Sequence, residues 1–375
     1  MTAPKLRFKE FDGEYSLSTI KSIAKIFVGR DLVENAYSLI KTDTHIYPIY
    51  SNSVDNQGLY GYYNFEEFNF SDDALTVVGR GAGLGTAFYR QNGFGTIGRL
   101  LCLTPKEKTF HPKYLADYIN NKLVIHNESG GIPQLPRSSL ENYEVVLPEY
   151  NEQTKIASFL FAVDEKISQL TQKHELLRQY KQGMMQKLFS QQLRFKADDG
   201  NEFGKWEEKK LHQIFQIKAG GDIDKSSVSQ VRTSEFSYPI FANSDKNKGF
   251  YGWANKFKYK DAVTVTGRGN LGIAVARNEP FYPIVRLLVL LPLVKQNLKF
   301  FEEKINLLDI VSESTGVPQL TAPQLSKYKV NVPLLEEQTK IANFLSAIDQ
   351  KIETVVQQIE QAKTWRKGLL QQMFV

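Results

Sequence analysis

The chain has 375 residues, of which 42% are hydrophobic and 12% aromatic, and its formal net charge is +6. This composition predicts a globular protein with enough apolar residues for two cores, and the positive charge favours an anionic partner. The single cysteine, Cys102, excludes an internal disulfide and a cysteine-rich metal site, and the five histidines lack metal-ligand spacing. Because the chain shows neither a signal peptide nor an apolar run approaching about 18 residues, we expect a cytoplasmic protein with no membrane partner.

The sequence is an internal repeat. The hexapeptide Glu-Gln-Thr-Lys-Ile-Ala at 152–157 returns 185 residues later, at 337–342. A repeat of this length, well above the roughly 20 to 50 residues of solenoid repeats, can hold a complete domain and implies two equivalent binding surfaces. Further segments recur in the same order: Leu-Arg-Phe-Lys at 6–9 and 193–196, Tyr-Pro-Ile at 47–49 and 238–240, and Gly-Arg-Gly at 79–81 and 267–269.

Each repeat has a β-rich part followed by a helical part. Residues 1–148 and 194–333 are rich in Tyr, Phe, Val and Ile, with frequent Gly, Asn, Asp and Pro, a pattern that predicts short strands and turns. Residues 149–193 and 334–375 follow a proline, have acidic first turns, and carry apolar residues in heptad steps, which predicts long helices. We therefore predict an α+β fold, in which two similar mixed β-rich domains are separated by two long helices that form an antiparallel coiled coil.

Two basic residues, Lys181 and Arg366, interrupt the apolar seam of these helices at equivalent repeat positions. The helices should run antiparallel, because the second β-rich domain receives its chain from one helix and returns it to the other, and domain termini usually lie close together. With the helices fully overlapped, Lys181 lies beside Asp349 and Arg366 beside Asp164. We predict these two ion pairs; the alternative is that both basic side chains reach solvent from the edge of the seam.

A glycine-rich segment, Gly267–Gly272, fits the dinucleotide-binding pattern G-x-G-x-x-G. The residues that follow it read as a strand rather than a helix, which favours a hairpin over a dinucleotide site. Arg80 and Arg268, on the two equivalent turns, are candidates for a phosphate or a guanine edge, unless each pairs with a local carboxylate. The chain contains no phosphate loop, zinc-protease or serine-hydrolase signature, so we expect no catalytic residue and no cofactor.

Aromatic and amide residues cluster near the Tyr-Pro-Ile segments, and such groups bind sugars and base edges, although half or more of the aromatics should be core residues. An acidic pair, Glu302 and Glu303, we assign to the solvated face of a helix. Besides Arg80 and Arg268, the candidate DNA-binding residues are Asn52, Ser53, Tyr62, Asn243, Ser244, Lys248 and Trp253.

Several of these segments together resemble the specificity subunit of a type I restriction-modification system. They are the proline followed by acidic-Gln-x-x-Ile at 148–156 and 333–341, the Gly-x-Pro-Gln-Leu segments at 131–135 and 316–320, the Leu-Arg-Phe starts and the paired helices. The resemblance implies two target recognition domains that each read half of a bipartite site in double-stranded DNA. It also implies that the helices set the half-site spacing and bind two modification (methyltransferase) subunits, which carry S-adenosylmethionine, while motor nuclease (restriction) subunits join for cleavage.

The two recognition domains of one subunit in this family are often dissimilar, whereas these two share several segments. We therefore expect half-sites that are partly inverted repeats of each other. Differences at Val54/Asp245, Gln57/Lys248, Tyr62/Trp253 and Thr86/Ile273 should limit that symmetry. The alternative function is a coiled-coil scaffold that binds protein or glycan through its β-rich domains, which a weak dependence of binding on salt would indicate.

Overall fold

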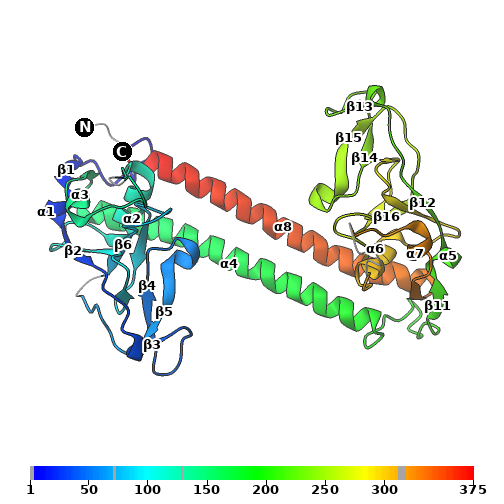
Figure 1. The fold of residues 1–375 in the computed structure, drawn as a ribbon, viewed down its shortest axis with the longest axis horizontal. Coiled ribbons are helices and arrows are strands. Elements are labelled where there is room, and N and C mark those ends of the chain that lie inside the picture. The colour runs from blue at the N-terminus through cyan, green and yellow to red at the C-terminus, as the bar shows by residue number, and fades with distance from the viewer. Residues whose placement is uncertain (1–3, 71–72, 128–129, 311–317) are drawn as a thin grey trace. The chain divides into compact units, whose positions relative to one another are not determined.

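The two halves of the sequence fold into two compact units that contain the same elements in the same order (Figure 1). Unit 1 consists of Met1–Thr171 and Gln357–Val375, and unit 2 of Gln172–Val356. Each unit therefore holds one β-rich domain and a part of both long helices. The computed structural model describes residues 4–70, 73–127, 130–310 and 318–375.

The described residues of unit 1 form two four-stranded sheets and a strand pair. The first sheet has the order β2-β9-β6-β7 and is antiparallel throughout. The second has the order β3-β5-β4-β8, with β4 and β8 parallel, and β1 pairs with β10. The strands are β1 (Ser16–Thr19), β2 (Ala24–Val28), β3 (Tyr37–Ser38), β4 (Tyr47–Tyr50), β5 (Leu59–Tyr63), β6 (Ala74–Val77), β7 (Ala87–Arg90), β8 (Gly95–Thr96), β9 (Leu101–Pro105) and β10 (Glu144–Leu147).

Unit 2 repeats this topology in its described residues. Its sheets have the orders β12-β19-β16-β17 and β13-β15-β14-β18, with β14 and β18 parallel, and β11 pairs with β20. The strands are β11 (Glu207–Lys210), β12 (Phe215–Ala219), β13 (Val228–Ser229), β14 (Tyr238–Phe241), β15 (Phe250–Ala254), β16 (Ala262–Val265), β17 (Ala274–Arg277), β18 (Tyr282–Pro283), β19 (Leu288–Pro292) and β20 (Lys329–Val332).

Short helices connect these strands, and one of them in each unit, α2 or α6, packs on the first sheet. The short α-helices are α1 (Ile20–Ile23), α2 (Pro112–Lys122), α3 (Arg137–Glu141), α5 (Leu211–Ile214), α6 (Leu298–Asn306) and α7 (Ala322–Leu325). The 3-10 helices are η1 (Glu34–Ala36), η2 (Asp55–Gly58), η3 (Lys225–Ser227) and η4 (Lys246–Gly249). Among the helices of the described ranges, none is long and apolar enough to cross a membrane.

The two long helices are α4 (Tyr150–Phe189) and α8 (Leu335–Met373), which lie within the predicted helical segments. In unit 1 the first turns of α4 share one apolar core with the last turns of α8. In unit 2 the last turns of α4 and the first turns of α8 likewise belong to one core. Within each unit the two helices are therefore antiparallel, as the connectivity predicted, and both are continuous with the core of the β-rich domain.

The start of each long helix is joined to its domain by a buried carboxylate. Glu152 is 0% exposed and accepts hydrogen bonds from Arg7 Nε at 2.8 Å and Nη2 at 2.7 Å. Glu337 is also 0% exposed and is bound in the same way by Arg194, at 3.0 and 2.8 Å. Two motifs of the repeat, Leu-Arg-Phe and the acidic-Gln pair, are thus the two halves of one contact. A bidentate arginine-carboxylate pair of this kind is strong and directional.

The glutamine that follows each buried carboxylate completes the attachment. Gln153 donates from Nε2 to the Pro148 carbonyl at 2.9 Å and accepts at Oε1 from the amide of His111 at 2.9 Å. Gln338 makes the same bonds, to the Pro333 carbonyl at 3.0 Å and from the amide of Asn297 at 3.0 Å. Both amide groups therefore satisfy backbone atoms next to the helix start.

Both predicted ion pairs are present. In unit 1 Arg366 contacts Asp164 through Nε and, at 3.1 Å, through Nη2. Lys113, from α2, bridges Asp164 at 2.9 Å and Asp117 at 2.8 Å, and Arg366 also reaches Asp117 at 3.2 Å. The pair is therefore part of a closed network that also holds a helix of the β-rich domain.

The equivalent pair in unit 2, Lys181 with Asp349, has a separation of 2.7 Å. Lys181 also binds Glu303 at 2.9 Å, and Lys299 joins Glu303 and Asp349. Our assignment of Glu303 to a solvated helix face was wrong, because this side chain is only 5% exposed and neutralises two lysines. On the same helix α6, Glu302 is 17% exposed and contacts Lys299 and the backbone of β17 rather than the helix pair, so its assignment to a solvated face was wrong as well.

Removing the Arg366 charge tests the unit 1 network. In Arg366→Met, Asp117 and Asp164 keep only Lys113, and we expect a loss of unfolding free energy of about 2 kcal/mol, between the effects of exposed and of fully buried ion pairs. Lys363→Met is the matched control, because Lys363 and its partner Glu360 are both more than half exposed; it should cost at most about 0.5 kcal/mol. Chemical denaturation measures both, and equal effects would contradict the role of the network.

The same networks predict a loss of stability in acid. Burial alone would raise the pKa of Asp164 and Asp349. Hydrogen bonds and charges from Arg366 and Lys113, and from Lys181 and Lys299, more than offset this and hold each pKa below the ordinary value of an aspartate. A lowered pKa stabilises the folded state above the unfolded value of about 3.9, and this stabilisation is lost as the pH falls further. We expect stability to decline below about pH 4 and the decline to be smaller in Asp164→Asn and Asp349→Asn. Urea titrations between neutral and acid pH measure the difference; an unchanged decline would refute the assignment.

Candidate functional site

In each unit, loops from the two sheets converge to form one surface. In unit 1 one amide side chain joins three of them: Asn52 accepts at Oδ1 from the amide of Gly79 at 2.8 Å and donates from Nδ2 to the Gly98 carbonyl. Asn243 makes the same contacts with Gly267, at 2.7 Å, and with Val285. We call these surfaces loop cluster 1, of residues 51–58, 79–86, 97–100 and 133–136, and loop cluster 2, of residues 242–249, 267–273, 284–287 and 318–321.

The Gly-Arg-Gly turns are hairpins, as the sequence predicted. They connect the antiparallel strands β6 to β7 and β16 to β17, so a strand, not a helix, follows each turn. This excludes the dinucleotide-binding geometry, in which a helix N-terminus receives the phosphates. The glycines Gly81 and Gly85, like Gly269 and Gly272, have positive φ values. The first turn is one residue longer than the second, so Gly85 lies one residue further from the start of its Gly-Arg-Gly segment than Gly272 does.

Each of these turns is paired with the Pro-Gln-Leu segment of the same unit. Arg80 forms an isolated β-bridge with Gln134, and Arg268 with Gln319. The amide of Leu135 donates to the Gly79 carbonyl at 2.9 Å, and that of Leu320 to Gly267 at 2.9 Å. Two repeated motifs therefore form one backbone ladder, although Gly316 of the second Pro-Gln-Leu segment lies outside the described residues. Arg80 and Arg268 have exposed side chains at the rim of this ladder.

The 3-10 turns η2 and η4 have an unusual left-handed backbone. Asn56 and Gln57 have φ values of 45° and 53°, and Asn247 and Lys248 have values of 48° and 50°. Such conformations are uncommon outside glycine and persist where the surrounding structure holds them. The exposed side chains at 57 and 248 are thereby presented on identical backbones.

A buried arginine holds each of these turns. Arg90 is 3% exposed; its Nη2 donates to the Gln57 carbonyl at 2.6 Å, its Nε to Thr76 at 2.9 Å, and its guanidinium lies 3.5 Å from the Tyr50 ring centroid. Burial lowers the pKa of Arg90 to about 10, so it stays charged at neutral pH.

The second unit contains the same contact. Arg277 is 9% exposed, donates to the Lys248 carbonyl and to Thr264, and lies 3.5 Å from the Phe241 ring centroid. Burial also lowers the pKa of Arg277 to about 10. We infer that Arg90 and Arg277 position the turns rather than contact a ligand, because their guanidinium groups are enclosed in the fold.

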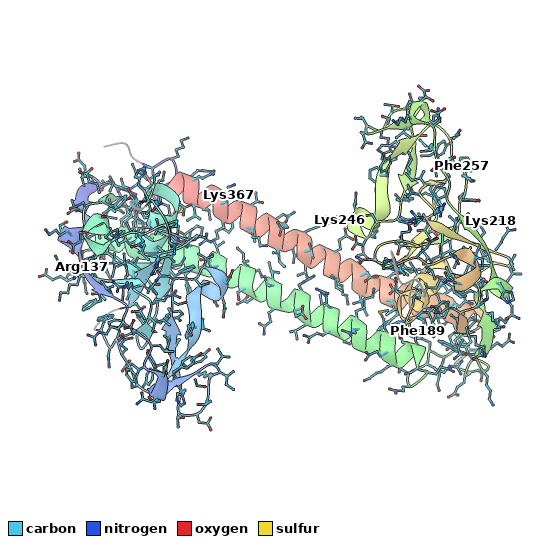
Figure 2. All side chains as sticks on the ribbon, in the orientation of Figure 1. Arg137, Phe189, Lys218, Lys246, Phe257 and Lys367 are labelled. Atoms are coloured by element: carbon cyan, nitrogen blue, oxygen red, sulfur yellow. The ribbon has the colours of Figure 1, made fainter. Side chains whose placement is uncertain are left out.

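Several of the predicted site residues also serve the fold. Besides the amides of Asn52 and Asn243, the hydroxyls of Ser53 and Ser244 accept hydrogen bonds at 3.2 Å from the amides of Asp55 and Lys246, inside the turns. We infer that these four residues shape the loop clusters. Figure 2 shows Lys246 on η4, on the turn that also carries Lys248.

Tyr62 and Trp253 lie outside the loop clusters. They are on β5 and β15, opposite Pro48 and Pro239 and away from the turns. Trp253 packs against the guanidinium of Arg232, 4.8 Å from its ring centroid. Each of these aromatics is half-buried on the second sheet of its own unit, apart from the loop cluster.

Two arginines at equivalent positions were missed in the sequence. Arg99 lines a surface pocket of about 440 Å³ in unit 1 together with Arg80, Gln134 and Arg137. Arg286 is its counterpart in unit 2, on the turn that Asn243 holds. The signal that would have found them is a further repeated segment, Ile-x-Arg-Leu-Leu at 97–101 and 284–288. No group of acidic, histidine or cysteine side chains within the described ranges is placed to hold a metal ion.

Comparison with known proteins gives a consistent result. A protein of Mycoplasma pneumoniae named type I specificity subunit S.MpnORF507P is 28% identical over 332 residues, which are 88% of this chain and 88% of that protein. The MjaVIII type I restriction enzyme specificity subunit of Methanocaldococcus jannaschii is 23% identical over 339 residues, covering 81% and 79%.

The fold has a solved counterpart. The crystal structure of the S subunit of a type I restriction-modification system from M. genitalium matches with a TM-score of 0.72 at 19% identity, over 100% of this chain and 99% of that one. The family model described as type I restriction modification DNA specificity domain matches residues 13–179 and 204–364, once for each repeat. The chain therefore belongs to the type I restriction-modification DNA specificity family.

Proposed function

We propose that this chain is the DNA sequence-specificity subunit of a type I restriction-modification complex. The observation that carries the proposal is the duplicated loop cluster, with exposed arginines at equivalent positions, in a chain whose two halves both match the specificity-domain family. Each β-rich domain reads one half of a bipartite site in double-stranded DNA, and the helical pair fixes the half-site spacing. The chain itself is non-catalytic and acts in the cytoplasm, where it binds its target DNA.

The repeated backbone of the two loop clusters supports half-sites that are related in sequence. The turns η2 and η4 have nearly the same φ values, and each carries an asparagine followed by a residue that differs, Gln57 or Lys248. Glutamine pairs with adenine and lysine with guanine in the major groove. The half-sites are therefore partly inverted repeats, with differences where Gln57 and Lys248, or Val54 and Asp245, stand at equivalent positions.

The partners of the chain are two modification subunits, with restriction motor subunits in the full complex. Support for two equivalent docking sites comes from a pair of exposed aromatics on the long helices, Tyr180 at 51% and Trp365 at 52% exposure. They are 185 residues apart, and each directly precedes a basic residue of the seam. S-adenosylmethionine and the methyl transfer to adenine belong to the modification subunits.

Methylome sequencing of cells that express the chain with and without its modification partner tests the function. We expect a bipartite N6-methyladenine motif that needs both proteins, with halves that are partly inverted repeats. Wholly unrelated halves would refute the symmetry while leaving the specificity role intact. If an active partner yields no motif, the scaffold alternative is favoured instead.

Substitution of the two exposed aromatics tests the docking sites. Tyr180→Ser and Trp365→Ser should each weaken one of two partner sites by roughly 30-fold, the effect of losing an aromatic anchor worth about 2 kcal/mol. Native mass spectrometry at limiting partner concentration should then show one bound modification subunit instead of two. The control is Phe161→Ser, since Phe161 is 44% exposed but its repeat counterpart is Ser346; the same loss of partner there would refute the assignment.

A further inference from the structure

The repeated Ile-x-Arg-Leu-Leu segments contain a strained turn in both units. Gly98 and Arg99 have φ values of 67° and 66°, and Val285 and Arg286 have values of 52° and 59°. Two consecutive residues with positive φ are unusual, and a β-branched valine in this region is an outlier. The local sequence does not favour this turn, so the surrounding structure must hold it.

Backbone hydrogen bonds hold the turn in the same way in both units. The amides of Gly98 and Arg99 donate to the carbonyls of Arg30 and Gly29 at 3.0 and 3.1 Å. In unit 2 the amides of Val285 and Arg286 donate to Gly221 and Gly220 at 3.1 and 3.0 Å. The amide groups of Asn52 and Asn243 bind the carbonyls of Gly98 and Val285. The turn that these contacts hold places an exposed arginine, Arg99 or Arg286, at the same position in both units.

In unit 1 this position brings three arginines to one pocket. Arg99, Arg80 and Arg137 line it together, with Gln134 beside them. Arg137, the first residue of α3 and labelled in Figure 2, is paired with Glu141 at 2.7 Å. Within the described part of the chain, neither Arg80 nor Arg99 has an acidic partner. Guanidinium groups that share a pocket repel one another, and a phosphate, which accepts bidentate hydrogen bonds from arginine, relieves that repulsion.

Unit 2 keeps two of the three arginines. Arg268 and Arg286 stand at the positions of Arg80 and Arg99, and Gln319 at that of Gln134. Ala322, the first residue of α7, replaces Arg137, the first residue of α3. The two units therefore share a pair of arginines, and only unit 1 has the Arg137–Glu141 ion pair at its edge.

We propose that Arg80 with Arg99, and Arg268 with Arg286, each clamp one backbone phosphate of a DNA half-site. The proposal rests on the function given above and adds the chemistry of this contact: these arginines bind the backbone and set the register of each domain, while the side chains of the left-handed turns read the bases.

The test measures DNA binding by the complex of this chain with its modification subunits over a range of salt concentrations. Arg99→Asn removes the charge and suits the backbone, because asparagine tolerates positive φ. We expect binding to weaken by the same factor for a duplex that contains the motif found by methylome sequencing and for a duplex of scrambled sequence. The slope of log affinity against log salt should fall in magnitude by about 0.9, so that the loss of affinity between about 50 and 200 mM salt becomes roughly 3-fold smaller.

Further variants make the result specific to the clamp. Arg286→Asn should have the same effect. In the double variant the decrease in slope should be about twice that of either single variant, because the two sites are independent. A duplex with one neutral methylphosphonate at the clamped position should bind more weakly to the wild-type complex, and the loss should be smaller for Arg99→Asn, in which only Arg80 still contacts that phosphate. Lys363→Asn, at an exposed lysine of α8 in unit 1, is the control and should leave the slope unchanged.

Each other outcome overturns the proposal in a distinguishable way. If Arg99→Asn weakens only the motif duplex and relaxes one base of the methylome motif, the arginine reads a base. If it lowers the melting temperature with no change in slope, its role is structural. If the wild-type complex does not prefer the motif duplex to the scrambled one, the proposed function fails. If it does prefer the motif duplex but Arg99→Asn leaves the salt slope unchanged, only the phosphate clamp fails.

Discussion

The architecture of both units depends on a buried carboxylate at the first turn of each long helix. Glu152 and Glu337 are completely enclosed, and a buried carboxylate is stable only when it is paired and hydrogen-bonded. Arg7 and Arg194 supply both conditions through bidentate contacts. The contact fixes where the helix leaves its β-rich domain, and every residue further along the helix takes its position from that origin. Inserting or deleting one residue there would rotate the apolar seam by about 100° relative to the domain.

In the two charge networks, as at the helix starts, a charge removed from solvent is stabilised by pairing. Basic residues in an apolar seam would normally weaken a helix pair, because charges lose solvation there. Here each is bound by carboxylates from both the opposite helix and a helix of the β-rich domain. Moving a helix within its unit would leave charges unpaired, so the networks specify the register in addition to stabilising it. The apolar residues of the seam would tolerate such a movement more easily.

Much of this arrangement follows from the sequence, because it depends on spacing. The heptad pattern and the order of the elements predicted the helices, their antiparallel course and both seam ion pairs. The further partners of Lys181 and Arg366, Glu303 and Asp117, were not foreseen, because they come from helices of the β-rich domains. The bonds of Asn52 and Asn243 to other loops were also not predicted, because a tertiary contact has no local sequence signature.

The loop clusters could be predicted less well from the sequence, for a different reason. Arg99 and Arg286 lie in a segment whose sequence resembles an ordinary strand start, and only the positive φ values set them apart. Backbone strain of this kind is imposed by neighbouring loops and cannot be deduced from the propensities of the residues that bear it. The repeat itself was the available clue, because a residue that returns at the same place in a second copy of a domain shares its environment.

The buried arginines Arg90 and Arg277 have a consequence for how such a protein changes over evolutionary time. Each grips its turn through a backbone carbonyl, which is present whatever the residue at 57 or 248. The shape of the turn is thereby uncoupled from the identity of the side chain at its tip. Substitutions at the tip by residues that tolerate a left-handed backbone keep this support, whereas loss of the arginine would remove it. A lineage can therefore explore new chemistry at this surface while the scaffold that presents it stays the same.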